Sequence, residues 1–258
     1  MNIGEIFKDS LKYPFTNSKQ FIILAVLFLL GNLGNLFVNF NVAASNLIFV
    51  FEIVAIITSI LAGGYLLKII KNGTLADNQI SEFNLSQDFV SGIKIIVLGI
   101  VFFIIPFVIA VLVAQVTGFF TAFVDVLEFS LNNPSVALPT ALSNSLGQST
   151  AITGIVSSIV FFIFSIFCSV AVCILASTQS LKEALGFKRI ANDISSIGWG
   201  KYIAWIIVNC IIILILSIIF SFIMTGINYI GFAVWYFLFQ TYMSLYSARS
   251  LGLIYSNS

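Results

Sequence analysis

The chain has 258 residues, of which 60% are hydrophobic and 8% are charged, and its net charge is +1. Soluble domains carry about 25% charged residues, so this composition excludes a water-soluble fold and indicates an integral membrane protein. The scattered basic residues form no clustered patch for a phosphate backbone, and no nucleic-acid partner is predicted.

Six apolar stretches are long enough to cross a membrane as helices. A bilayer core of about 30 Å requires about 20 apolar residues in a helix, which satisfies its own backbone N–H and C=O groups. The predicted fold class is therefore all-α, a polytopic transmembrane helical bundle arranged as three tandem hairpins in one membrane domain, residues 1–258. In chain order, the predicted spans are 21–40, 47–67, 93–114, 152–176, 202–224 and 230–246.

The basic residues predict the orientation of these spans. All 11 Lys and Arg lie on one side of the six-span map: before span one, beside the connections between spans two and three and between spans four and five, and after span six. The opposite connections contain Asp125 and Glu128 but no Lys or Arg. By the positive-inside rule the basic side is cytoplasmic, which predicts a cell-membrane protein with both termini in the cytoplasm.

Amphipathic segments are predicted on the cytoplasmic side before spans one, three and five. Residues 2–15 and 180–197 place apolar side chains at helical spacing between charged ones, and residues 80–89 show a weaker version of this pattern. Two interpretations are open, because such helices lie in the headgroup plane or cap the bundle. Residues 120–132 of the long outer loop show the same pattern and predict an interfacial helix.

A polar cluster around Glu52 is the main candidate site, because an ionisable group inside hydrocarbon is costly. Asn32, Asn35 and Asn39 share one face of span one at about the height of Glu52 in span two, and Ser59 lies on the face of Glu52. One interpretation is hydrogen bonding between helices. The other is a polar path in which Glu52 accepts a proton or a cation.

Pro106 predicts a kink in span three, which serves either packing or gating. The three cysteines, Cys168, Cys173 and Cys210, all lie in apolar stretches and are interpreted as packing residues. The chain has no His, no nucleophile elbow and no Gly-rich phosphate loop. No catalytic residue, cofactor, cofactor-binding residue or metal ligand is therefore predicted.

Four segments resemble one known family. They are residues 5–15 (EIFKDSLKYPF), 64–70 (GYLLKII), 83–94 and 249–255 (RSLGLIY). These segments are similar to those of domain-of-unknown-function family 4013, whose members are polytopic membrane proteins found largely in archaea. The resemblance implies a membrane location and no known activity, and the Asn- and Ser-rich outer loop departs from the family pattern.

Three functional hypotheses follow. The first is a non-enzymatic membrane component that associates with the lipid bilayer, with other membrane proteins or with a second copy of itself. The alternative is a small-solute or ion transporter or channel that uses the polar site around Glu52, and the third is an intramembrane enzyme. A water-filled cavity that reaches Glu52 would favour transport, whereas a sealed bundle would favour the first hypothesis.

Overall fold

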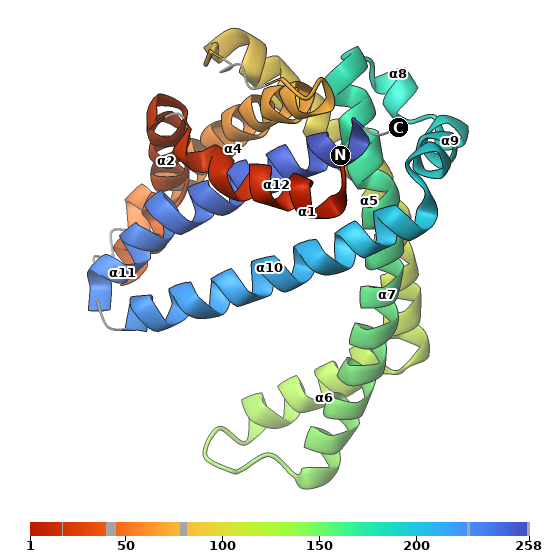
Figure 1. Cartoon of the computed structure of the whole chain (residues 1–258). Coiled ribbons are helices and arrows are strands. Elements are labelled where there is room, and N and C mark those ends of the chain that lie inside the picture. The colour runs from red at the N-terminus through yellow and green to blue at the C-terminus, as the bar shows by residue number, and fades with distance from the viewer. Residues whose placement is uncertain (17, 40–44, 78–81, 226–227, 257–258) are drawn as a thin grey trace. The chain divides into compact units, whose positions relative to one another are not determined.

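The computed structural model describes residues 1–16, 18–39, 45–77, 82–225 and 228–256, and within them all regular structure is helical (Figure 1). The helices in chain order are α1 (Ile3–Lys12), the short 3-10 helix η1 (Tyr13–Phe15), α2 (Ser18–Gly31), α3 (Leu33–Asn39), α4 (Ser45–Thr74), α5 (Leu85–Val116), α6 (Phe119–Asn132), α7 (Thr140–Thr178), α8 (Leu181–Ala184), α9 (Phe187–Ile197), α10 (Trp199–Thr225), α11 (Asn228–Val234), the π-helix η2 (Trp235–Gln240) and α12 (Thr241–Tyr255).

Four predicted spans lie on single long helices, namely α4, α5, α7 and α10. Among the described residues these four are long and apolar enough to cross a membrane, over Leu47–Thr74, Leu85–Val116, Thr140–Thr178 and Trp199–Phe222. A fifth span results if Ile3–Phe15 and Ser18–Gly31 are counted together as one bent pair. The chain is thus all-helical with four to five candidate membrane spans.

The first and last predicted spans lie on interrupted helices. The amide of Asn32 donates to the carbonyl oxygen of Phe28 at 2.8 Å, and the chain leaves regular α-helix at Asn32, between α2 and α3. Asn side chains compete with the helix backbone in this way, which accounts for the break. The last predicted span lies on α11, η2 and α12, where the π-helix interrupts the regular α-helical spacing.

Two of the three predicted amphipathic segments, residues 2–15 and 180–197, are largely helical, and residues 85–89 of the third form the start of α5. α1 begins with a capping box, in which the side chain of Asn2 accepts from the Glu5 N–H and the carboxylate of Glu5 accepts from the Asn2 N–H. Ile6 and Phe7 on its apolar face are buried, and α1 packs against α12. α9 likewise buries Ile190, Ile194 and Ile197. Because protein covers both apolar faces, the structure favours the bundle-capping interpretation of these helices.

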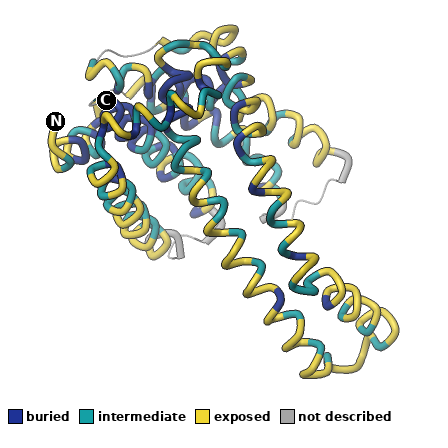
Figure 2. The backbone as a smooth tube through the Cα atoms, turned by 90° about the vertical axis from the view of Figure 1, so that its right-hand side faces the viewer, coloured by how far each residue is buried: buried dark blue, intermediate teal, exposed yellow. Residues whose placement is uncertain are grey.

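The chain divides into two compact units, Met1–Leu98 with Ser169–Ser258, and Gly99–Cys168. In the larger unit, α2 and α12 both pack against α4. A Cβ atom on Gly252 of α12 would overlap the carbonyl oxygen of Ile70 and lie 2.7 Å from the Cα of Gly73, so glycine is what permits this close approach to α4. Figure 2 shows that the buried residues gather near the two chain ends, which both belong to this unit.

The smaller unit contains the predicted interfacial helix. α6 follows Gly118, which adopts a left-handed conformation with φ of 73°, and it covers the predicted residues 120–132. Its apolar residues Phe120, Phe123 and Leu127 are exposed. An exposed apolar stripe on a short helix is typical of a helix that lies in the membrane interface.

Candidate functional site

The structure brings together only part of the predicted polar cluster. Asn35 Nδ2 donates to Asn32 Oδ1 at 3.3 Å, so these two residues meet beside the break between α2 and α3. Glu52 and Ser59 are exposed on α4, and none of the described contacts joins Glu52 to Asn32 or Asn35. The side chain of Asn39 lies outside the described residues.

Other residues mediate the contact of α2 and α3 with α4. A Cβ atom on Gly31 would lie 2.8 Å from the hydroxyl oxygen of Thr58, so α2 and α4 approach closely at this level. The rings of Phe37 and Phe51 stack with their centroids 4.8 Å apart. Pro106 is buried in α5, which continues as one helix on both sides of it.

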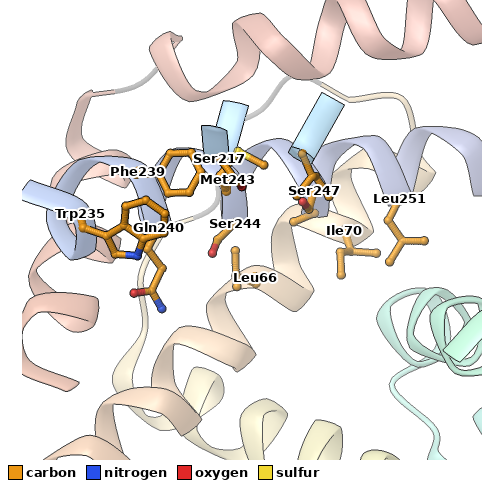
Figure 3. Close-up of a pocket in the computed structure, with 12 residues that line it drawn as sticks. Leu66, Ile70, Ser217, Trp235, Phe239, Gln240, Met243, Ser244, Ser247 and Leu251 are labelled. Carbon is orange, nitrogen blue, oxygen red and sulfur yellow. The ribbon is translucent and has the colours of Figure 1, made fainter. Parts of the chain in front are cut away.

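The larger unit has an apolar groove between α4, α10, η2 and α12, with a volume of about 500 Å³ (Figure 3). No charged residue lines it, and its polar side chains are three serines and one glutamine. The lining residues are Leu66, Ile70, Ile213, Ser217, Trp235, Phe239, Gln240, Met243, Ser244, Ser247, Ala248 and Leu251. This volume lies within the range of about 300–1,000 Å³ that is usual for binding sites of small molecules.

An aromatic cluster forms one end of the groove. The centroids of the Trp235 and Phe239 rings are 4.4 Å apart, and Phe239 also stacks on Phe220 at 4.6 Å. Figure 3 shows Trp235 at this end and Leu251 at the other. Since 251 − 235 = 16 residues, the groove extends about 24 Å along η2 and α12 at 1.5 Å per residue.

The π-helix shapes this end of the groove. A π-helix adds a residue to the helical turn and shifts the side chains that follow it, and such segments occur often at functional sites. Trp235, Phe239 and Gln240 of the lining all belong to η2. Chemically, an uncharged groove with four polar side chains suits a long apolar ligand.

A buried arginine, which the sequence analysis counted only as a cytoplasmic charge, connects the two ends of the chain. Arg249 of α12 is 1% exposed, and its Nε donates to Asp9 Oδ1 of α1 at 2.8 Å. Its guanidinium also donates to the carbonyl oxygen of Asp77 at 2.6 Å and lies 5.0 Å from the ring centroid of Tyr13. The sequence signal for this residue is its isolation, because it is the one charged residue of the segment 241–255.

These observations define an all-α protein with several candidate membrane spans and an uncharged groove beside a π-helix. The chain belongs to the family described as Protein of unknown function (DUF4013), which it matches over residues 47–225. This match confirms the family that the sequence segments resembled. No curated protein and no solved structure matches the chain. The groove combines matched residues of α4 and α10 with residues of η2 and α12 that follow the matched range.

Proposed function

We propose that the chain is a six-span, non-enzymatic component of the cell membrane, with both termini in the cytoplasm, that binds an acyl chain of a lipid in the groove. The observation that carries this proposal is the uncharged groove of about 500 Å³ in the larger unit. Partners other than lipid, including membrane proteins and a second copy of the chain, would bind to the exposed apolar surfaces of the long helices.

The surface of the long helices supports residence in a bilayer. On α10, Leu214 is 61% exposed and Phe222 is 76% exposed. In water such side chains would be unfavourable by about 25 cal/mol for each Å² of apolar surface, whereas hydrocarbon imposes no such cost. The proposed first span, 21–40, then lies on α2 and α3, and the proposed sixth span, 230–246, lies on α11, η2 and the start of α12.

The dimensions of the groove support an acyl chain as its occupant. Half of a bilayer core is about 15 Å thick, so a groove of about 24 Å is long enough for an extended chain from one leaflet. Ser217, Gln240 and Ser244 add polar contacts along the groove. The groove contains no ionisable side chain, which favours a neutral apolar ligand segment.

A photoactivatable fatty-acyl lipid in proteoliposomes tests the groove. Ser244→Trp would fill the groove and is expected to reduce labelling of the protein by at least about fivefold, because the acyl chain can then no longer bury its apolar surface there. Ile218→Trp, on an exposed part of α10, is the matched control and is expected to label like the unchanged protein. Equal labelling of both variants, or labelling that maps away from η2 and α12, would refute the proposal.

Cysteine accessibility tests the topology. In a background that lacks the native cysteines, a cysteine at exposed Ser195 of α9 is expected to react with an impermeant maleimide only after the cytoplasmic side is opened. A cysteine at exposed Asn132 of α6 is expected to react in intact cells. Reaction of both from the same side would contradict the six-span arrangement without bearing on the groove.

A further inference from the structure

A second cavity of the larger unit, here called the lysine pocket, lies where the end of α4, the start of α5 and the end of α7 meet. Its volume is about 440 Å³. Three lysines, two serines and two glutamines make most of its lining, which consists of Lys68, Lys71, Ser86, Gln87, Val90, Ser91, Lys94 and Gln179. In contrast to the groove, this cavity is polar and positively charged.

The lysine pocket has an excess of positive charge. Lys68 forms an ion pair with the fully buried carboxylate of Asp88 at 2.7 Å, and it also donates to the carbonyl oxygen of Glu82 at 3.1 Å. Lys94 donates to the carbonyl oxygen of Gln179 at 3.0 Å, a neutral acceptor that leaves its charge uncompensated. Lys71 is exposed and has no described ion pair. Three lysines against one carboxylate leave 3 − 1 = 2 positive charges.

The hydroxyl group of Ser91 lines the lysine pocket and has no described protein partner. Ser91 is 8% exposed and lines the cavity, and none of the described hydrogen bonds involves its Oγ atom. A ligand that enters the pocket can therefore form a hydrogen bond with this oxygen.

The backbone end of α5 does not provide the site. The side chain of Asn84 accepts from the Gln87 N–H at 3.1 Å, and the Asp88 carboxylate accepts from the Asn84 N–H at 2.8 Å. These two bonds cap the helix from within the protein. The groups available to a ligand are therefore side chains, above all those of Lys71, Lys94 and Ser91.

We propose that the lysine pocket binds the phosphate group of an anionic phospholipid. Ammonium and hydroxyl donors form charge-assisted hydrogen bonds with phosphate oxygens, and basic pockets between membrane helices on the cytoplasmic side recognise such headgroups. Lys71 and Lys94 supply the charge, and Ser91 supplies a hydroxyl donor at the wall of the pocket.

The surface beside the lysine pocket favours a lipid over a soluble phosphate. Val90 lines the pocket and is exposed, and Ile93 and Val97 continue the exposed apolar surface along α5. A lipid whose headgroup occupies the pocket can lay its acyl chains on this surface. The basic residues of the pocket also lie on the proposed cytoplasmic side, where anionic lipid headgroups are found.

Enrichment of a labelled anionic lipid tests the assignment. Full-length protein is reconstituted in nanodiscs of phosphatidylcholine with a minor fraction of labelled phosphatidylglycerol, and the labelled lipid that stays bound after detergent extraction is measured. The double change Lys71→Gln and Lys94→Gln is expected to reduce its retention by about tenfold. Lys8→Gln with Lys182→Gln removes the same charge from exposed cytoplasmic positions and is expected to retain the lipid.

Three outcomes would overturn the proposal. They are equal losses in the two double variants, no loss in the pocket variant, and complete displacement of the lipid by inorganic phosphate, which would assign the pocket to a soluble phosphate. Ser91→Ala keeps every charge and is expected to reduce retention severalfold while thermal unfolding stays unchanged. The groove variant Ser244→Trp is expected to keep the anionic lipid, so the two proposals are tested separately.

Discussion

Removing either partner of the buried pair between Arg249 and Asp9 is expected to have unequal effects on stability. Asp9→Ala leaves a guanidinium that is 1% exposed without its carboxylate. Arg249→Met leaves a carboxylate whose side chain is 32% exposed and can regain water, while the methionine fills most of the vacated volume. The prediction is that losing the smaller, more exposed residue of the pair is the more destabilising change.

The magnitudes follow from what each variant leaves behind. An uncompensated buried charge costs about 3–5 kcal/mol, and Asp9→Ala should fall near 3 kcal/mol because Asp77 and Tyr13 still contact the cation. Arg249→Met should cost about 1–2 kcal/mol, since apolar replacement of a buried charge is often tolerated. The double variant should resemble Arg249→Met alone, which corresponds to a coupling free energy of about 3 kcal/mol.

Unfolding by SDS in mixed micelles, followed by tryptophan fluorescence, measures these free energies. Trp205 is a suitable reporter, because its indole N–H donates to the hydroxyl of Ser250 next to Arg249 at 2.8 Å. Lys8→Met removes an exposed charge next to Asp9 in the same helix and is expected to change stability by less than about 0.5 kcal/mol. Additive effects of the two single changes, or a cost below about 1 kcal/mol for Asp9→Ala, would refute the reasoning.

Two further predictions concern packing and protonation. In the SDS titration, Gly252→Ala should lower the free energy of unfolding by about 1–3 kcal/mol, because the new methyl group overlaps the carbonyl oxygen of Ile70. Gly200→Ala, where a Cβ atom would have nothing within 4 Å, is the control and should be neutral or slightly stabilising. Equal effects of the two changes would contradict the close approach of α12 to α4. Tyr255→Phe should cost about 1.5 kcal/mol by removing a 2.6 Å bond to Asp193. Burial and the Asp193 bond raise the pKa of Tyr255 above its ordinary 10.0, so the phenol stays protonated and its contribution is lost only at higher pH. The cost should be the same at pH 6 and pH 9, and a smaller cost at pH 9 would disprove this.

The sequence predicted the long spans well because hydrocarbon imposes a length on continuous apolar helices. The predicted span 202–224 lies entirely within α10, and the apolar periodicity of residues 120–132 identified α6. α7 contains the predicted span 152–176 but begins at Thr140, which is 152 − 140 = 12 residues earlier. Residues 140–151 are rich in Ser, Thr and Asn, and such polar residues give no apolar signal even where the helix continues through them.

The groove and the lysine pocket were beyond sequence reasoning because each is assembled from distant segments. Leu66, Ser217 and Trp235 come from three different helices, and each one alone is an ordinary membrane residue. The prediction of a polar cluster around Glu52 required that the first two spans face each other with their polar residues at equal depth in the membrane. Helical depth was predictable from the sequence, but the rotation of each helix about its axis depends on packing, which Gly31 and Phe37 decide here.

The polar contacts of the larger unit also explain how an uncharged groove is kept in place. The bonds of Arg249 to Asp9 and of Tyr255 to Asp193 fix the last two turns of α12 against α1 and α9, and Gly252 fixes its distance from α4. With α12 held at this end, the π-helix before it can displace Trp235 and Phe239 without changing the register of α12 against α4. If so, ligand-dependent change should be confined to η2, and hydrogen exchange should decrease there on lipid binding while α12 stays equally protected. Exchange that changes along all of α12 would show that the polar contacts do not hold the helix independently of the groove.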